Sequence, residues 1–246
     1  MVNPMRNRGA ISGTSQRLYE CELDGTVRVR YEDTWGGTHE KLNTIGADVK
    51  TVILDIFVMT TNGVPAVSNT IVLRDLADAT ERYAQADIRI QTGLVTQVEM
   101  PSNVATNWHV MDETVMVNPR TYYLTMAAKT VLDTLQRTTG HIGVVYVHGP
   151  LCGLDDTDSC SGVAIAECSF KRSEDVGYLG YLFISSFDPS VFTLAHEGGH
   201  ILINEGHSLD LWDLMYEFGN ADKNVKRPKR LRSDKVQIMR GSPYIQ

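Results

Sequence analysis

Two histidines four positions apart, with a glutamate directly after the first, are the clearest indication of a chemical function in this sequence. His196 and His200 frame the segment His-Glu-Gly-Gly-His, in which the glutamate is Glu197. On an α-helix, positions i and i+4 lie on one face, so both imidazoles can bind the same ion. Histidine nitrogens are typical zinc ligands, and a glutamate beside them can act on water held at the metal. The spacing therefore predicts a zinc site with Glu197 as general base.

The residues around the histidines predict a helix over about 189–203. Asp188 suits the N-cap, and Pro189 suits the first helical position, where its missing N–H costs nothing. Gly198 and Gly199 lie inside this helix, and each lowers helix stability by roughly 1 kcal/mol relative to alanine. We expect the two glycines to reflect the close approach of another backbone or of substrate.

A third metal ligand is expected from the segment that follows the helix. Asn204 and Gly206 tolerate left-handed backbone, so the chain can reverse there and bring His207 back toward the metal. The carboxylates of Glu205 and Asp210 are also acceptable zinc ligands and stay open as alternatives. Three protein ligands leave the fourth position of zinc to water, as in catalytic sites.

The segment from His196 to Tyr216 resembles the metzincin clan of zinc endopeptidases. The clan signature is H-E-x-x-H-x-x-G-x-x-H followed by a turn that contains methionine. The His207-Ser208 opening and the Leu214-Met215-Tyr216 ending are most similar to the matrixin branch. Upstream, residues 162–169 and 176–179 resemble the paired edge strands that precede the zinc helix in reprolysins and matrixins.

This sequence departs from the clan pattern at one place. Ile203 stands where the clan has its glycine, and His207 comes one residue later than the third histidine of the signature. The turn therefore carries one extra residue, and Gly206 is expected to take over the turning role.

The resemblance also implies a role for each residue. Zinc lowers the pKa of bound water to about 7, and Glu197 takes the proton and delivers it to the leaving amine. Met215 would form an apolar floor beneath the metal. Tyr216 would contact the oxyanion, although the branch with that role spaces Met and Tyr differently. An extended peptide would pair with an exposed strand edge, and an interior strand without a free edge is the alternative. By resemblance this edge comprises Gly162, Val163, Ala164, Ile165 and Ala166.

The order of the expected elements predicts an α/β (α+β) fold: a metzincin-like mixed twisted sheet with two packed helices, the zinc helix and a small C-terminal lobe. Residues 1–48 are expected to form an N-terminal extension with a hairpin, 49–206 an upper lobe, and 207–246 a lower lobe of one catalytic domain. The expected elements are a hairpin at 18–32, strands at 52–60, 88–100 and 142–147, and helices at 70–85, 121–137 and 233–239.

Composition restricts the partners. The net charge of −7 argues against general nucleic-acid binding, and no apolar run approaches the length of a membrane span. The C-terminal tail is basic and would suit an acidic partner, although a solvated basic stretch explains it as well. The cations of this tail are Lys223, Lys226, Arg227, Lys229, Arg230, Arg232, Lys235 and Arg240.

Compartment and other bound ions stay open. Residues 1–17 lack the apolar core of a secretory signal, whereas the resemblance favours secretion. Cys152, Cys160 and Cys168 lie close in sequence, so one disulfide among them is an option. An acidic loop would suit calcium or simply be solvated, and it does not match an EF-hand. Its carboxylates are Asp155, Asp156 and Asp158.

These observations predict a zinc-dependent endopeptidase that acts on protein or peptide substrates. A zinc hydrolase of small amides or cell-wall peptides is an alternative from the same class. A non-proteolytic protein that keeps zinc for structure is the alternative from another class. Structural zinc sites fill all four positions with protein ligands and favour cysteine, and they have no need of Glu197.

Overall fold

The computed structural model describes residues 17–21, 26–32, 38–44, 49–104, 108–113, 122–149, 151, 161–170, 173–186, 192–208, 214–215 and 231–246. Before residue 49 it describes the backbone alone. The chain divides into two compact units, Met1–Val49 and Lys50–Gln246, and each is described by itself.

The first unit contains a small antiparallel sheet. Its strands are ordered β1-β2-β3, and β1 pairs with β2 as the expected hairpin. A third strand, β3, extends the sheet beyond that hairpin. The bounds are Arg17–Cys21 for β1, Thr26–Glu32 for β2 and Thr38–Thr44 for β3.

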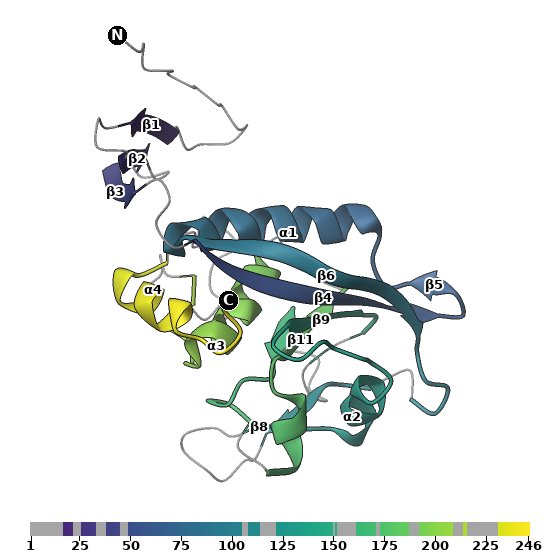
Figure 1. Ribbon diagram of the computed structural model, residues 1–246. Helices are drawn as coiled ribbons and strands as arrows, with labels where there is room; N and C mark the ends of the chain where they lie inside the picture. Colours follow the sequence, from purple (N-terminus) through teal and green to yellow (C-terminus); the bar gives the residue numbers. More distant parts are fainter. Residues whose placement is uncertain are drawn as a thin grey trace. The chain divides into compact units, whose positions relative to one another are not determined.

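The described residues of the second unit form a mixed six-stranded sheet, as expected from the sequence (Figure 1). The order is β6-β4-β9-β11-β10; the first four strands are parallel, and β10 is antiparallel to β11. The two-residue strand β5 forms a hairpin with the end of β4. The bounds are Lys50–Thr61 for β4, Val64–Pro65 for β5, Ile88–Glu99 for β6, Ile142–Val147 for β9, Gly162–Ala164 for β10 and Tyr181–Ser185 for β11.

Successive residues of β4 point to opposite faces of the sheet and supply two apolar cores. On one face, Val52 and Leu54 join a core with the helices α1 and α3. On the other, Phe57 and Met59 join a core with α2. Helices on both faces of a largely parallel sheet bury both surfaces of its strands. The helices are α1 (Asn69–Tyr83), α2 (Met126–Leu132), α3 (Thr193–Ile203), α4 (Ser233–Arg240) and the 3-10 helices η1 (Ala84–Ala86) and η2 (Ser173–Tyr178).

The buried carboxylate of Asp55 connects β4 to neighbouring segments through hydrogen bonds. Asp55 of β4 is fully buried and lies where the pairing of β4 with β6 shifts register. It accepts hydrogen bonds from the backbone N–H groups of Leu94 and Thr138 at 2.9 and 2.7 Å, and from His141 Nδ1 at 2.9 Å. Burial raises the pKa of Asp55, but these hydrogen bonds outweigh it and hold the pKa below its usual value.

The helix expected at 121–137 was wrong at both ends, because α2 spans only Met126–Leu132. Residues Tyr122–Leu124 form strand β8, which pairs with β7 (Met111–Glu113), and α2 begins only at Met126. Thr125 is the N-cap, and its hydroxyl accepts a hydrogen bond from Ala128 N–H at 3.1 Å. Two tyrosines before a capping threonine favour a strand over the first turn of a helix.

The expected pair of edge strands needs two corrections. Residues 176–179 are not a strand, because 176–178 belong to η2; the partner of β10 is instead β11. Strand β10 ends at Ala164, so Ile165 and Ala166 lie outside the strand expected to run to residue 166. Gly180, with φ of +87°, turns the chain from η2 into β11.

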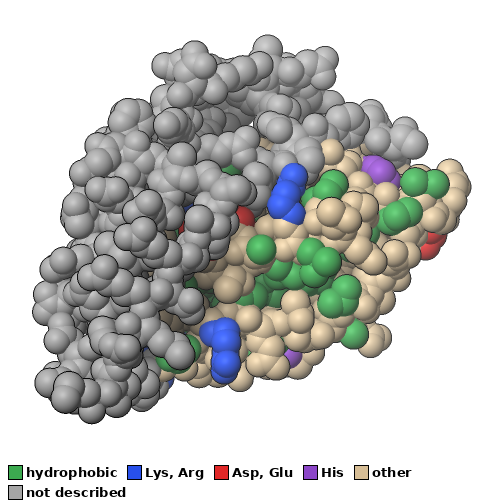
Figure 2. Space-filling model, turned by 90° about the horizontal axis from the view of Figure 1, so that it is seen from above, with side chains coloured by type: hydrophobic (Ala, Val, Ile, Leu, Met, Phe, Trp, Pro, Cys, Tyr) green, Lys and Arg blue, Asp and Glu red, His purple; other side chains and the backbone are tan. Residues whose placement is uncertain are grey.

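Three observations on the second unit concern possible partners. Figure 2 looks onto the face that bears α1 and shows apolar side chains gathered among few charged ones. No described helix is long and apolar enough to cross a membrane. Three cations of the basic tail are described, and each has an acidic partner within the chain. The pairs are Arg232 with Asp234, Lys235 with Glu205 and Arg240 with Asp87.

Candidate metal centre

Helix α3, which carries the histidine pair, is buried along its whole length. It contacts α1, α4, β10 and β11, which hold it from several sides. It begins at Thr193 with Phe192 at the N-cap, later than the expected start at 189. Asp188 and Pro189, expected to start the helix, lie outside the described residues.

The chain reverses at the end of α3 at Asn204, whereas Gly206, which was expected to take over the turning role, does not have left-handed backbone. Asn204 adopts left-handed backbone, with φ of 55°, as expected. Its N–H donates to His200 O at 2.9 Å, and its side-chain oxygen accepts from Cys168 N–H at 2.8 Å. Cys168 is a free thiol. Asn204 therefore ends the helix and also ties it to the segment after β10.

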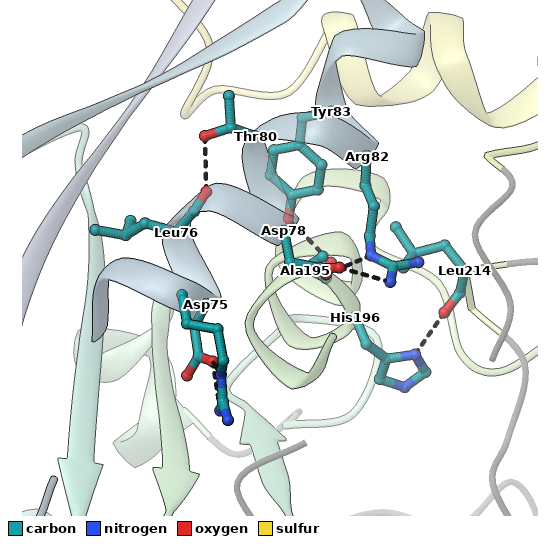
Figure 3. A network of polar contacts seen from close by, with 10 residues as sticks. Asp75, Leu76, Asp78, Thr80, Arg82, Tyr83, Ala195, His196 and Leu214 are labelled. Carbon is teal, nitrogen blue, oxygen red and sulfur yellow. Dashed lines mark hydrogen bonds and ion pairs between the residues drawn. The ribbon is translucent and has the colours of Figure 1, made fainter. Parts of the chain in front are cut away.

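The two glycines inside α3 make room for side chains, not for backbone or substrate as expected. A Cβ at Gly198 would lie 2.3 Å from Tyr83 Oη, and a Cβ at Gly199 would lie 2.5 Å from Met215 Sδ. Tyr83 reaches across from α1 and donates a hydrogen bond to Ala195 O at 3.0 Å (Figure 3). The low helix propensity of glycine is thus offset by two close side-chain contacts.

Backbone carbonyls orient the first two imidazoles. His196 Nδ1 lies 2.6 Å from Leu214 O (Figure 3), and His200 Nδ1 lies 2.8 Å from Glu205 O. A carbonyl only accepts hydrogen bonds, so each Nδ1 carries the proton and each Nε2 carries a lone pair. This arrangement, in which a ligating histidine donates its other N–H to a fixed acceptor, is typical of metal sites.

The two Nε2 atoms face one another across 3.2 Å. Two zinc–nitrogen bonds of about 2.0–2.1 Å at the tetrahedral angle place their nitrogens roughly 3.3–3.4 Å apart. Two lone pairs at this distance repel each other, and a shared cation removes the repulsion. The donor set and its spacing therefore fit a zinc ion.

The imidazole of His207 lies close to those of His196 and His200. The His207 ring centroid lies 5.3 Å from that of His196 and 4.8 Å from that of His200. One ligand nitrogen from each of the three rings lies within 4.8 Å of the other two. Of the open alternatives, the Glu205 carboxylate is paired with Lys235, and Asp210 lies outside the described residues.

Burial keeps the two helical imidazoles neutral at ordinary pH. It lowers the pKa of His196 to about 4, and the nearby His207 and Arg82 add to this effect. It lowers the pKa of His200 to about 3, with further lowering from the other two histidines. Neutral imidazoles are the form that binds metal.

Glu197 lies between α3 and strand β10. Burial raises the pKa of Glu197 to about 8, while a hydrogen bond from the Ala164 backbone N–H acts in the opposite direction. A Cβ at Gly162 would lie 2.7 Å from Glu197 Oε1, so the carboxylate is packed directly against the strand. With this pKa the carboxyl group is largely protonated at neutral pH, and the positive charge of a bound metal would lower the pKa and favour the ionised form that accepts a proton.

The structure also places the remaining expected residues. Met215 is buried, with its sulfur beside Gly199, whereas Tyr216 lies outside the described residues. Sequence reasoning did not find Tyr83 or the orienting carbonyls. The Gly-Gly pair was the available signal for Tyr83, but carbonyl groups belong to every residue and leave no trace in a sequence. Other expected residues also lie outside the described part of the chain: Cys152, Cys160, Asp155, Asp156 and Asp158.

Comparisons with known proteins add structural similarities at low sequence identity. No protein family matches the sequence, and no curated protein matches it. Metalloproteinase-II from Bacteroides fragilis is similar at 11% identity and a TM-score of 0.48, over 93% of this chain and 76% of that chain. Archaemetzincin from Methanopyrus kandleri is similar at 13% identity and a TM-score of 0.45, over 77% of this chain and 94% of that chain. A zinc-dependent peptidase from Methanocorpusculum labreanum is similar at 14% identity and a TM-score of 0.40, over 76% and 99%. With all three TM-scores at 0.48 or lower, these similarities do not by themselves assign a function.

Proposed function

We propose that the protein is a zinc-dependent endopeptidase of the metzincin type. His196, His200 and His207 are the proposed zinc ligands, and Glu197 is the proposed general base. The observation that carries this proposal is the pair of oriented Nε2 lone pairs 3.2 Å apart, on a helix whose next residue after His196 has a buried carboxyl group. A structural site needs no such carboxyl.

Each group of the proposed site has a separate role in the reaction. The carbonyls of Leu214 and Glu205 hold two imidazoles in the tautomer that presents Nε2. Zinc, when bound, supplies positive charge that activates water and polarises a peptide carbonyl. Glu197 accepts a proton at a carboxylate oxygen and passes it to the leaving amine. His196, His200 and Glu197 are buried, which strengthens their electrostatic contacts, whereas His207 is exposed and leaves that side of the site open to water and substrate.

Neighbouring elements complete the proposed site. Met215 packs against Gly199 on the helix that carries the ligands, which suits an apolar floor for the metal. The substrate is proposed to be a protein or peptide that pairs in extended form with the edge of β10. Tyr216 remains the proposed contact for the oxyanion.

The test is digestion of casein or gelatin by the zinc-loaded protein, with and without a chelator. We expect hydrolysis that the chelator abolishes and that added zinc restores. Glu197→Gln should lose this activity while it keeps zinc, because the amide cannot accept the proton. Hydrolysis that survives in the glutamine variant would refute the assigned base, and hydrolysis of small amides alone would refute the endopeptidase.

A further inference from the structure

Strand β10 touches Glu197 in two ways. The backbone N–H of Ala164 donates a hydrogen bond to the Glu197 carboxylate. The Glu197 side chain also fills the space beside Gly162, where a Cβ would lie 2.5 Å from Glu197 Cγ and 2.6 Å from Thr193 Cγ2. Any side chain at residue 162 would therefore have to displace the base or the start of α3.

The direction of the main-chain groups explains how Ala164 reaches the base. Ser161 O accepts a hydrogen bond from β11 at 2.9 Å, and Ile165 N–H donates to β11 at 2.8 Å. In an antiparallel pair, successive residues turn their main-chain groups to opposite sides. Gly162 and Ala164 consequently turn theirs toward the edge away from β11.

We propose, on the basis of the proposed function, that β10 positions the general base. Ala164 N–H binds one oxygen of the Glu197 carboxylate, and the missing side chain of Gly162 lets Glu197 lie against the strand. Both are positioning residues, because they act through Glu197.

This arrangement makes the two oxygens of the carboxylate unequal and restricts substrate binding. A carboxylate has two oxygens, so one held by an N–H leaves the other to take a proton. The same edge of β10 is the proposed binding edge for an extended peptide. Because Ala164 N–H is already donated to Glu197, the peptide has to pair with this edge without that donor.

Amide hydrogen exchange tests the contact without any need for activity. The Ala164 amide should exchange at least about tenfold more slowly in the wild-type protein than in Glu197→Ala, since its acceptor is then gone. The Ile165 amide, which bonds to β11, is the internal control and should be unchanged. Equal exchange of Ala164 in the two proteins would overturn the proposal, whatever the activity.

Gly162→Ala, studied in the zinc-loaded enzyme, tests whether the missing side chain of Gly162 makes room for Glu197. The added Cβ needs roughly 1 Å more room, and a misplacement of that size costs about 100-fold in kcat. Zinc affinity, measured by competition with a chelator, should stay within twofold, because the three atoms nearest to a Cβ at residue 162 belong to Glu197 and Thr193 and not to a proposed ligand. Gly177→Ala is the matched control, since nothing lies within 4 Å of a Cβ there. A wild-type kcat in Gly162→Ala would overturn the proposal.

The outcomes separate this inference from the function on which it rests. A wild-type protein without zinc-dependent hydrolysis refutes the proposed function, while the exchange of the Ala164 amide still decides whether β10 holds Glu197. If Gly162→Ala does not fold or does not bind zinc, the exchange comparison alone decides.

Discussion

Replacement of Gly198 by alanine should destabilise the protein, against the ordinary helix preference. Alanine is better than glycine inside a helix by about 1 kcal/mol, so propensity alone predicts a gain. The structure predicts a loss, because the new Cβ would lie 2.3 Å from Tyr83 Oη. Tyr83 is only 2% exposed and is held between α1 and α3, so it has little room to move.

The magnitudes follow from these contacts. Overpacking in a core costs about 1–3 kcal/mol, and a shortfall of about 1 Å belongs to the upper part of that range, about 2–3 kcal/mol. After the helix gain of about 1 kcal/mol, Gly198→Ala should lower the free energy of unfolding by about 1–2 kcal/mol. Tyr83→Phe removes the hydroxyl and its hydrogen bond to Ala195 O, at a cost of about 1 kcal/mol. In the double variant the nearest remaining atom is Cζ of residue 83, at an ordinary contact distance of 3.5 Å. The two substitutions should therefore rescue each other, with a coupling energy of roughly 2 kcal/mol or more.

Urea unfolding of the four proteins, all zinc-free, measures this cycle. Gly177→Ala is the control and should change the free energy of unfolding by less than about 0.5 kcal/mol. If Gly198→Ala is as stable as the wild type, or if the two single effects simply add, Tyr83 does not occupy the space beside residue 198 and the explanation of this glycine is wrong.

Three further predictions concern the ligands and the framework. His207→Ala should weaken zinc binding by more than about 100-fold, because the loss of a ligand costs more than a change in a residue that only supports a ligand. Glu205→Ala keeps its backbone carbonyl and should bind zinc nearly as the wild type does. Competition with a chelator measures the zinc affinity of both variants, and weaker binding in Glu205→Ala than in His207→Ala would make Glu205 the ligand. Asp55→Asn should destabilise the protein most at neutral pH. The pKa of Asp55 is lowered on folding, so its contribution is complete above the unfolded value of about 3.9 and is lost as pH falls through the folded pKa. Urea unfolding at pH 7 and pH 3 should show the difference from wild type shrinking in acid, and a constant difference would refute the role of the charge. Lys235→Met breaks a partly exposed ion pair with Glu205 and should lower the free energy of unfolding by less than about 1 kcal/mol; a larger loss in thermal or urea unfolding would mean that this pair holds α4 on the zinc helix.

The sequence predicted the framework where periodicity was strong. Strand β9 was predicted with its observed bounds, and β4, α1 and β6 to within a few residues, because long apolar patterns have a clear period. The failures came at short elements. Residues 122–124 continue the apolar pattern of α2 without a break in the sequence, so only the Thr125 cap distinguishes strand from helix there.

The clustering of the three histidines was predictable from the sequence, whereas the groups that orient their side chains were not. The type and spacing of side chains such as His196 and Glu197 predict their chemical roles. The groups that orient them are backbone carbonyls and an edge-strand N–H, which depend on tertiary structure alone. The Gly-Gly pair was a correct signal of close approach, but the sequence could not say that the approaching atoms were the Tyr83 hydroxyl and the Met215 sulfur.

The extra residue before His207 has a structural explanation in the Leu214–Met215 turn. Leu214 O accepts from His196, and Met215 O accepts from Ser208 N–H at 2.7 Å, one residue after the third histidine. The position of His207 is thus fixed from its far side by a backbone hydrogen bond, not by the number of residues that separate it from the helix. Met215 Sδ meanwhile fills the hollow over Gly199. A flexible thioether adapts to such a hollow more readily than a branched or aromatic side chain.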